Sequence, residues 1–117
     1  NRLDAPYDNI RQISNWNRFY KVVNAASVFI ENAGKVLEKD NAYSETNYIY
    51  DMSQARALRA LAYFYMVQMW GDVPLITQSY DNGTFPEVSR TDKEIVLTYV
   101  EKELLAVSQL LPELIGS

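Results

Sequence analysis

The chain has 117 residues, enough for one domain with a single modest core, and its 48% hydrophobic and 22% charged residues exclude both a disordered segment and a membrane protein. The net charge of −4, with 11 basic residues scattered along the chain, excludes the positive patch of a nucleic-acid-binding protein. Because the chain contains no cysteine and no histidine, disulfides, zinc sites with nitrogen or sulfur ligands and histidine-based catalytic triads are excluded as well.

The first helix is expected over residues 14–33. Ser14 can cap its start, and Gly34 weakens the helix enough to predict its end. Apolar residues recur every three or four positions and predict one buried stripe, formed by Trp16, Phe19, Tyr20, Val23, Ala26, Ile30 and Ala33. The segment 38–50 loses this periodicity and collects Asn, Ser, Thr and Tyr, which predicts a loop.

The second helix is expected over residues 51–70, starting at Asp51 or Ser53. It is apolar on nearly all sides, which is typical of a helix in the middle of a packed assembly. Gly71 can take the left-handed conformation that closes a helix, and Pro74 favours an extended residue before it. Leu75 and Ile76 are then expected to fold back as an apolar flap over the ring of Trp70.

The third helix is expected over residues 91–111, after a tight turn in Asp81-Asn82-Gly83. Thr91 and Glu94 have the spacing of a capping box, and Pro112 predicts the end of the helix. Its expected buried stripe consists of Val96, Val100, Leu104, Val107 and Leu111. Periodicity alone therefore predicts an all-α domain that is not a repeat array.

Clustered carboxylates are the only candidates for catalysis, and their spacing argues against it. Glycoside hydrolysis needs two carboxyl groups that face each other across a pocket. Glu101 and Glu103 point in different directions on a helix, while Asp92 and Glu94 suit the first turn of a helix. Neither enzymatic activity nor a cofactor nor a metal ion is expected.

Arg56 and Arg59 lie three residues apart on the apolar second helix. We expect them either to extend along the apolar surface with the charged group in water or to pair with a carboxylate at the helix edge, and both are favoured over anion binding.

Most aromatic residues fall on helical stripes and are expected in the core, but five fall in segments that resemble loops. An exposed ring in a loop can stack on the face of a sugar. The residues concerned are Tyr43, Tyr48, Tyr50, Tyr80 and Phe85. Four of them are our ligand-binding candidates: Tyr48, Tyr50, Tyr80 and Phe85.

The stretch SQARALRALAYFYMVQMWGDVPLIT, residues 53–77, resembles a signature of the SusD/RagB family of outer-membrane nutrient-binding lipoproteins. Ser53 and Gln54 depart from the Gly and Glu that are common there. The positions that match are Ala55, Arg56, Leu58, Arg59, Ala60, Tyr63, Phe64, Trp70, Gly71, Asp72, Val73, Pro74 and Leu75. We expect a structural role for Arg59, Trp70, Gly71, Asp72 and Pro74, which fix the exit of the chain from a central helix.

The resemblance implies that residues 1–117 are a single helical domain, an N-terminal fragment of a larger SusD-like protein. It implies tetratricopeptide-like helix pairs with long connecting loops. The whole protein is then expected to be non-catalytic, to capture oligosaccharides or peptides, and to deliver them to a TonB-dependent transporter of the SusC type. It is expected at the outer surface of the outer membrane, held by a lipid anchor that is absent from this chain. The alternative is a helical scaffold that binds proteins and no small molecule.

Overall fold

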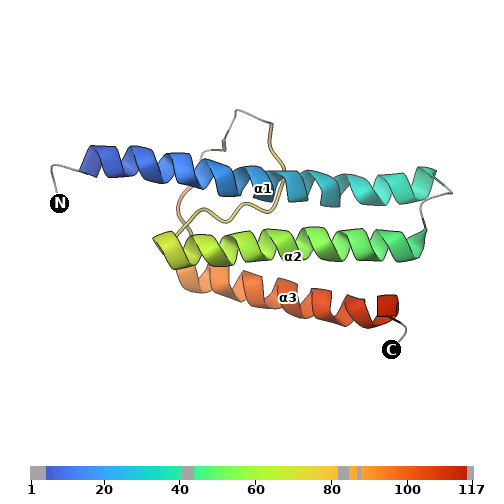
Figure 1. Ribbon diagram of the computed structural model, residues 1–117. Helices are drawn as coiled ribbons and strands as arrows, with labels where there is room; N and C mark the ends of the chain where they lie inside the picture. Colours follow the sequence, from blue (N-terminus) through green and yellow to red (C-terminus); the bar gives the residue numbers. More distant parts are fainter. Residues whose placement is uncertain (1–4, 41–43, 82–84, 87, 116–117) are drawn as a thin grey trace.

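The computed structural model describes residues 5–40, 44–81, 85–86 and 88–115, with side chains from residue 16 to residue 110 apart from the same gaps. These residues form three helices, α1 (Ala5–Lys39), α2 (Glu45–Trp70) and α3 (Lys93–Ile115), and no strand. The helices run alternately up and down in one layer with α2 in the middle, and the α2–α3 connection passes across α1 (Figure 1). The prediction of an all-α fold is confirmed.

Helix α1 is longer at both ends than the expected range of 14–33. Pro6 lies in the first turn, where a missing backbone N–H costs little. Gly34 does not end the helix, although glycine costs about 1 kcal/mol relative to alanine in a helix. Buried Ala33 and half-buried Leu37 continue the apolar stripe past Gly34, so packing outweighs this local cost.

Helix α2 begins at Glu45, and the predicted start at Asp51 or Ser53 is wrong. Ser44 caps the helix, because its hydroxyl accepts a hydrogen bond of 3.1 Å from the backbone N–H of Asn47. The expected loop over 38–50 therefore shrinks to a short link between α1 and α2. Tyr43 lies outside the described residues.

Helix α3 begins at Lys93, and the predicted capping box of Thr91 and Glu94 is wrong. The carboxylate of Asp92 accepts from the N–H of Glu94 at 2.8 Å, and that of Asp72 accepts from the N–H of Lys93 at 2.9 Å. These two carboxylates satisfy donors that a helix start leaves free. At the other end the helix runs past Pro112 to Ile115, so the predicted end at Pro112 is wrong.

The core lies where α1 and α3 pack against opposite sides of α2. The expected stripe of α3 is confirmed at Val96, Val100 and Val107, which are buried, while Leu104 is partly exposed. The fully buried large side chains are Tyr20, Val23, Tyr63, Met66, Val73 and Val96. Burial of α2 is limited to the sides that face its neighbours, and its expected place in the middle of a packed assembly is confirmed. No helix in the described ranges has the length and hydropathy needed to span a membrane.

Candidate functional site

The signature residues at the end of α2 lead into a segment that we call the strap, residues 71–80. Gly71 starts it with φ of 73° and ψ of −120°, and its N–H donates to the carbonyl oxygen of Val67 at 2.9 Å. The predicted positive φ is confirmed, but ψ lies outside the left-handed helical region. Val73 then forms an antiparallel bridge with Thr91. The N–H of Thr91 donates to the carbonyl oxygen of Val73 at 2.9 Å.

Two buried tyrosine hydroxyls hold the backbone of the strap. Tyr63 of α2 donates to the carbonyl oxygen of Ile76 at 2.8 Å and accepts from its N–H at 2.6 Å. Tyr20 of α1 donates to the carbonyl oxygen of Pro74. Burial raises the pKa of both tyrosines well above the ordinary value of 10.0, so both hydroxyls stay protonated as donors.

Arg59 connects the strap to all three helices. Only 7% of it is exposed. Its guanidinium donates to the carbonyl oxygen of Thr77 at 3.1 Å. It also donates to the hydroxyl of Ser27 on α1 at 2.9 Å and to the hydroxyl of Tyr99 on α3 at 2.8 Å. A single side chain of the signature thus fixes the relative positions of four segments.

Arg56 forms a two-pronged ion pair with Glu103 of α3, with N–O distances of 3.0 and 2.7 Å. A nitrogen of Arg59 lies 3.9 Å from the same carboxylate. The hydrogen bonds from Arg56 lower the pKa of the Glu103 carboxyl below its ordinary value of 4.5. The predicted pairing of the two arginines with a carboxylate is confirmed.

Trp70 packs against α1. Its ring meets those of Trp16 and Phe19 edge to face, with centroid distances of 6.2 and 5.8 Å. The ring is half-buried, and its aromatic contacts come from α1. Trp70 therefore ties the end of α2 to α1. The flap of Leu75 and Ile76 over this ring stays a prediction.

Tyr80 and Phe85, two of the four ligand-binding candidates, lie together at the end of the strap. Their ring centroids are 5.7 Å apart, and Phe85 packs edge to face on Tyr20 at 4.9 Å. The side-chain amide of Asn24 on α1 donates to the carbonyl oxygen of Tyr80 and accepts from its N–H, both at 2.9 Å. Tyr80 is half-buried, whereas 37% of Phe85 is exposed.

Tyr48 and Tyr50, the other two candidates, lie on the first turns of α2 and not in a loop. Tyr48 is half-buried against α1, where its hydroxyl approaches Gly34. Tyr50 is 49% exposed. The four candidates therefore form two separate pairs on the molecule, one near the start of α2 and one at the end of the strap.

Sequence reasoning missed the polar residues of α1 that hold the strap. Glu31 accepts from the N–H of Ser79 at 2.8 Å and from its hydroxyl, and these bonds lower the pKa of Glu31. Asn24 and Ser27 are both buried. Their presence on the apolar stripe of α1 was the available signal, because a buried polar side chain needs a hydrogen-bond partner.

The carboxylates of the two clusters do not face one another across a pocket. Asp92 caps α3, Glu103 is paired with Arg56, and Glu101 is exposed. Within the described part of the chain, no three acidic residues gather as a metal ion requires. The fold and the strap thus define a helical scaffold whose most recognisable residues make internal contacts.

The chain is similar to known proteins in both sequence and structure. Residues 3–116 match a SusD-like family described as "Starch-binding associating with outer membrane". A SusD superfamily protein from Bacteroides thetaiotaomicron has a solved structure that is similar with a TM-score of 0.82 and 58% sequence identity. A SusD-like protein from Bacteroides ovatus is 41% identical over 89 residues, and SusD-like protein P25 from Formosa agariphila is 29% identical over 89 residues.

The chain belongs to the SusD-like family. The segments aligned with the Bacteroides ovatus protein and with protein P25 each cover 76% of this chain and 16% of the relative. The likeness to the solved structure covers 92% of this chain and 24% of that one. The scaffold thus corresponds to a minor part of each of these proteins.

Proposed function

We propose that residues 1–117 form a single helical unit of a non-catalytic nutrient-binding protein at the outer surface of the outer membrane. The whole protein captures oligosaccharides and delivers them to a TonB-dependent transporter of the SusC type, and a lipid anchor outside this chain holds it at the membrane. The observation that carries this proposal is the match of residues 3–116 to a family described as starch-binding and associated with the outer membrane.

Contacts within the fold support a structural role for this unit. Arg59 and Asp72 each bond to a segment other than their own, and Trp70 packs against α1. Residues used in this way give the protein a rigid framework and leave ligand contacts to other side chains.

Among the four aromatic candidates, Tyr50 is the one that we propose for contact with a sugar. Nearly half of its surface is open on a rigid helix, which suits stacking against a sugar face. Tyr80 and Phe85 contribute to the packing around Tyr20, and Tyr48 is half-buried, so each has less free surface for a ligand.

Calorimetric titration with α-glucan oligosaccharides, together with capture of a SusC-type transporter in detergent, tests the proposed function. We expect binding of both by the full-length protein and at least a several-fold loss of glycan affinity in Tyr50→Ala. The control is Tyr65→Ala, a tyrosine on the same helix that is 57% exposed. Absence of glycan and of transporter binding by the wild-type protein would overturn the proposal.

The alternative function is a protein-binding scaffold without a small-molecule ligand. One observation favours it, namely the large apolar side chains of α2 that face solvent. Binding of the transporter or of another protein, with no heat of binding for oligosaccharides or peptides, is the result expected from this alternative.

A further inference from the structure

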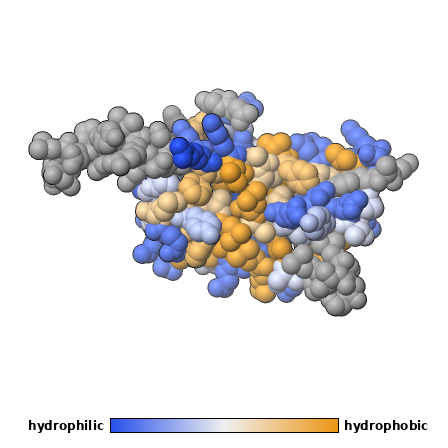
Figure 2. Space-filling view, viewed as in Figure 1, coloured by the Kyte–Doolittle hydropathy of each residue, from blue (hydrophilic) through white to orange (hydrophobic). Residues whose placement is uncertain are grey.

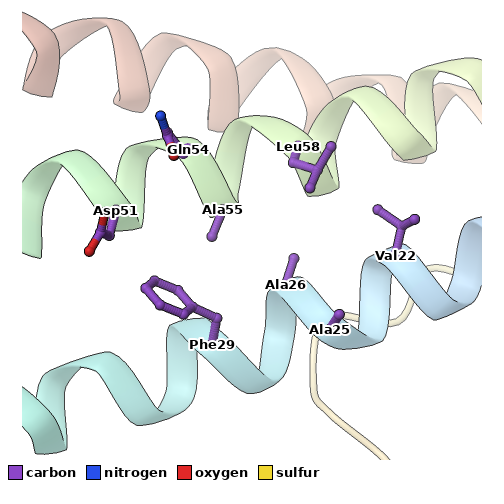
Figure 3. A pocket seen from close by; sticks show the side chains of 8 residues that line it. All are labelled: Val22, Ala25, Ala26, Phe29, Asp51, Gln54, Ala55 and Leu58. Carbon is purple, nitrogen blue, oxygen red and sulfur yellow. The ribbon is translucent and has the colours of Figure 1, made fainter.

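The hollow between α1 and α2 is mostly apolar, because six of the eight side chains that line it are apolar. Figure 3 shows Phe29 at one end and Val22 with Leu58 at the other, while small alanine side chains lie between them. Hydrophobic side chains also gather along the middle of the molecule, where α2 lies between its neighbours (Figure 2). A sugar presents many hydroxyl groups and needs several polar partners, so this part of the surface does not suit it.

A second hollow lies between residues 75–80 of the strap and the segment that returns to α3. Pro86 and Val88 of the returning segment line its other side. The bridge between Val73 and Thr91 joins the two segments, and the hollow lies beyond this bridge along both of them. Its volume is about 310 Å³, at the lower end of the range of about 300–1,000 Å³ that is common for ligand pockets. We call it the strap hollow.

The backbone that lines the strap hollow is already fixed by the helices. Tyr63 of α2 bonds to both polar groups of Ile76. Asn24 of α1 bonds to both polar groups of Tyr80 in the same way. A site whose wall is held in place before a ligand arrives loses little conformational freedom on binding, which favours affinity.

Two polar side chains of the strap are available to a ligand in this hollow. Thr77 and Gln78 line it and are exposed, and their side chains make no hydrogen bond to another described residue. A hydroxyl group both donates and accepts, and a side-chain amide does so through two separate atoms. The hydroxyl of Ser79 donates to Glu31 and can still accept. These groups match the hydroxyls of a sugar, each of which is a donor and an acceptor.

The remaining lining of the strap hollow favours an uncharged ligand with an apolar face. None of the described residues that line it carries a charge, which argues against a phosphate or a carboxylate. The ring of Tyr80 supplies an aromatic wall, and its contact with Phe85 and the bond of its hydroxyl to the carbonyl oxygen of Tyr20 hold it in place. Apolar surface beside a few polar groups is the usual composition of a small-molecule pocket.

We infer that the strap hollow is an accessory saccharide site, which binds one neutral sugar unit of an oligosaccharide. Thr77 and Gln78 bond to the hydroxyl groups of this sugar, and Tyr80 lies against the carbon-bound face of its ring. The site is separate from Tyr50, which lies near the start of α2. The inference rests on the proposed function, because it takes an oligosaccharide as the ligand, and it adds a second place on this chain where that ligand is held.

Protection of a thiol at residue 88 tests the inference in the full-length protein. Val88 lines the hollow and is 47% exposed, so Val88→Cys places a reactive thiol at the site. Glu101→Cys, at an exposed position of α3, is the control. The rate of maleimide labelling is measured with and without maltohexaose by mass spectrometry of the peptide that carries each thiol. Circular dichroism confirms that each variant is folded.

We expect saturating maltohexaose to slow labelling at residue 88 several-fold and to leave the control unchanged. Adding Gln78→Ala should raise the maltohexaose concentration needed for half-protection by about five-fold or more, whereas Gln68→Ala, at an exposed position of α2, should not change it. Protection that Gln78→Ala does not alter would overturn the inference.

Calorimetric titration of the same full-length protein with maltohexaose separates the inference from the proposed function. Heat of binding without protection at residue 88 would place the sugar elsewhere, which overturns the inference and leaves the proposed function standing. The absence of both heat of binding and protection would overturn the two together.

Discussion

The hydroxyl group of Tyr63 makes two hydrogen bonds to one residue of the strap, donating to the carbonyl oxygen of Ile76 and accepting from its N–H. Both residues are buried, and 13 positions of the chain separate them. A side chain of α2 therefore does the work of a neighbouring strand, because it satisfies both polar groups of a backbone unit that is removed from water.

Tyr63→Phe removes both bonds and leaves the two polar groups of Ile76 buried without their partner. We expect a loss of about 1–3 kcal/mol in the free energy of unfolding for each buried group left unpaired. Urea denaturation measures the loss. The matched control, Tyr65→Phe, alters an exposed hydroxyl and should change the stability by less than about 0.5 kcal/mol.

Arg59→Met keeps much of the side-chain volume but removes the donors that reach Ser27, Thr77 and Tyr99. Hydrogen bonds to charged groups contribute about 1.5–3 kcal/mol each, so we expect a destabilisation of about 3 kcal/mol or more. Arg18→Met, at an exposed position of α1, is the control in the same denaturation experiment. Equal stability of the two variants would show that Arg59 does not connect the helices.

Asp72→Ala removes the carboxylate that accepts from the N–H of Lys93 at the start of α3. Loss of a helix cap costs about 0.5–2 kcal/mol, so we expect thermal unfolding at a lower temperature. Asp81→Ala changes an exposed carboxylate elsewhere in the connection and should leave the melting temperature unchanged. A larger effect in Asp81→Ala than in Asp72→Ala contradicts the capping role.

Glu103 makes the stability depend on pH through its ion pair with Arg56. The pKa of Glu103 in the folded state lies below the ordinary value of 4.5, so its charged form stabilises the fold above pH 4.5. This contribution is lost as the pH falls from 4.5 through the lowered pKa. We expect Glu103→Gln to be less stable than wild type by about 1–3 kcal/mol at pH 7, and the difference to shrink at pH 3.

The exposed neighbour Glu101 supplies the control for this pH dependence. Glu101→Gln should be close to wild type in stability at both pH values. A stability difference for Glu103→Gln that stayed constant between pH 7 and pH 3 would contradict the ion pair.

Trp70→Ala removes a ring that meets Trp16 and Phe19 on α1. Large-to-small changes of aromatic core residues cost about 3–5 kcal/mol, and the half-buried position of Trp70 favours the lower end of this range. Chemical denaturation measures the cost, and Trp70→Phe, which keeps an aromatic ring, should recover part of it. A stable Trp70→Ala protein that has lost glycan binding alone would indicate a ligand-binding role instead.

The existence and order of the three helices could be predicted from the sequence, because their apolar residues follow the helical period. The ends could not, since tertiary packing decided them. Gly34 stays helical because the residues on either side of it are packed. At the start of α3 the capping hydrogen bonds come from Asp92 and Asp72, and not from Thr91. Local signals of this kind carry no information about a partner that lies far along the chain.

The role of the strap could be predicted in outline only. Positive φ at Gly71 and a paired Arg56 followed from residue type, and both are confirmed. The bonds from Tyr20 and Tyr63 to the strap backbone join residues that are 54 and 13 positions apart, and no periodicity predicts such pairs. Polar residues on the apolar stripe of α1 were the signal in the sequence that α1 bonds to the strap.

We propose that the signature residues build the scaffold by fastening the strap to the helices. Hydrogen exchange at the amides of Ile76 and Thr91 tests it most directly, since these N–H groups bond to Tyr63 and to Val73. We expect both amides to exchange only through openings whose free energy approaches that of global unfolding. Exchange of both amides at rates typical of an unprotected loop would contradict the claim.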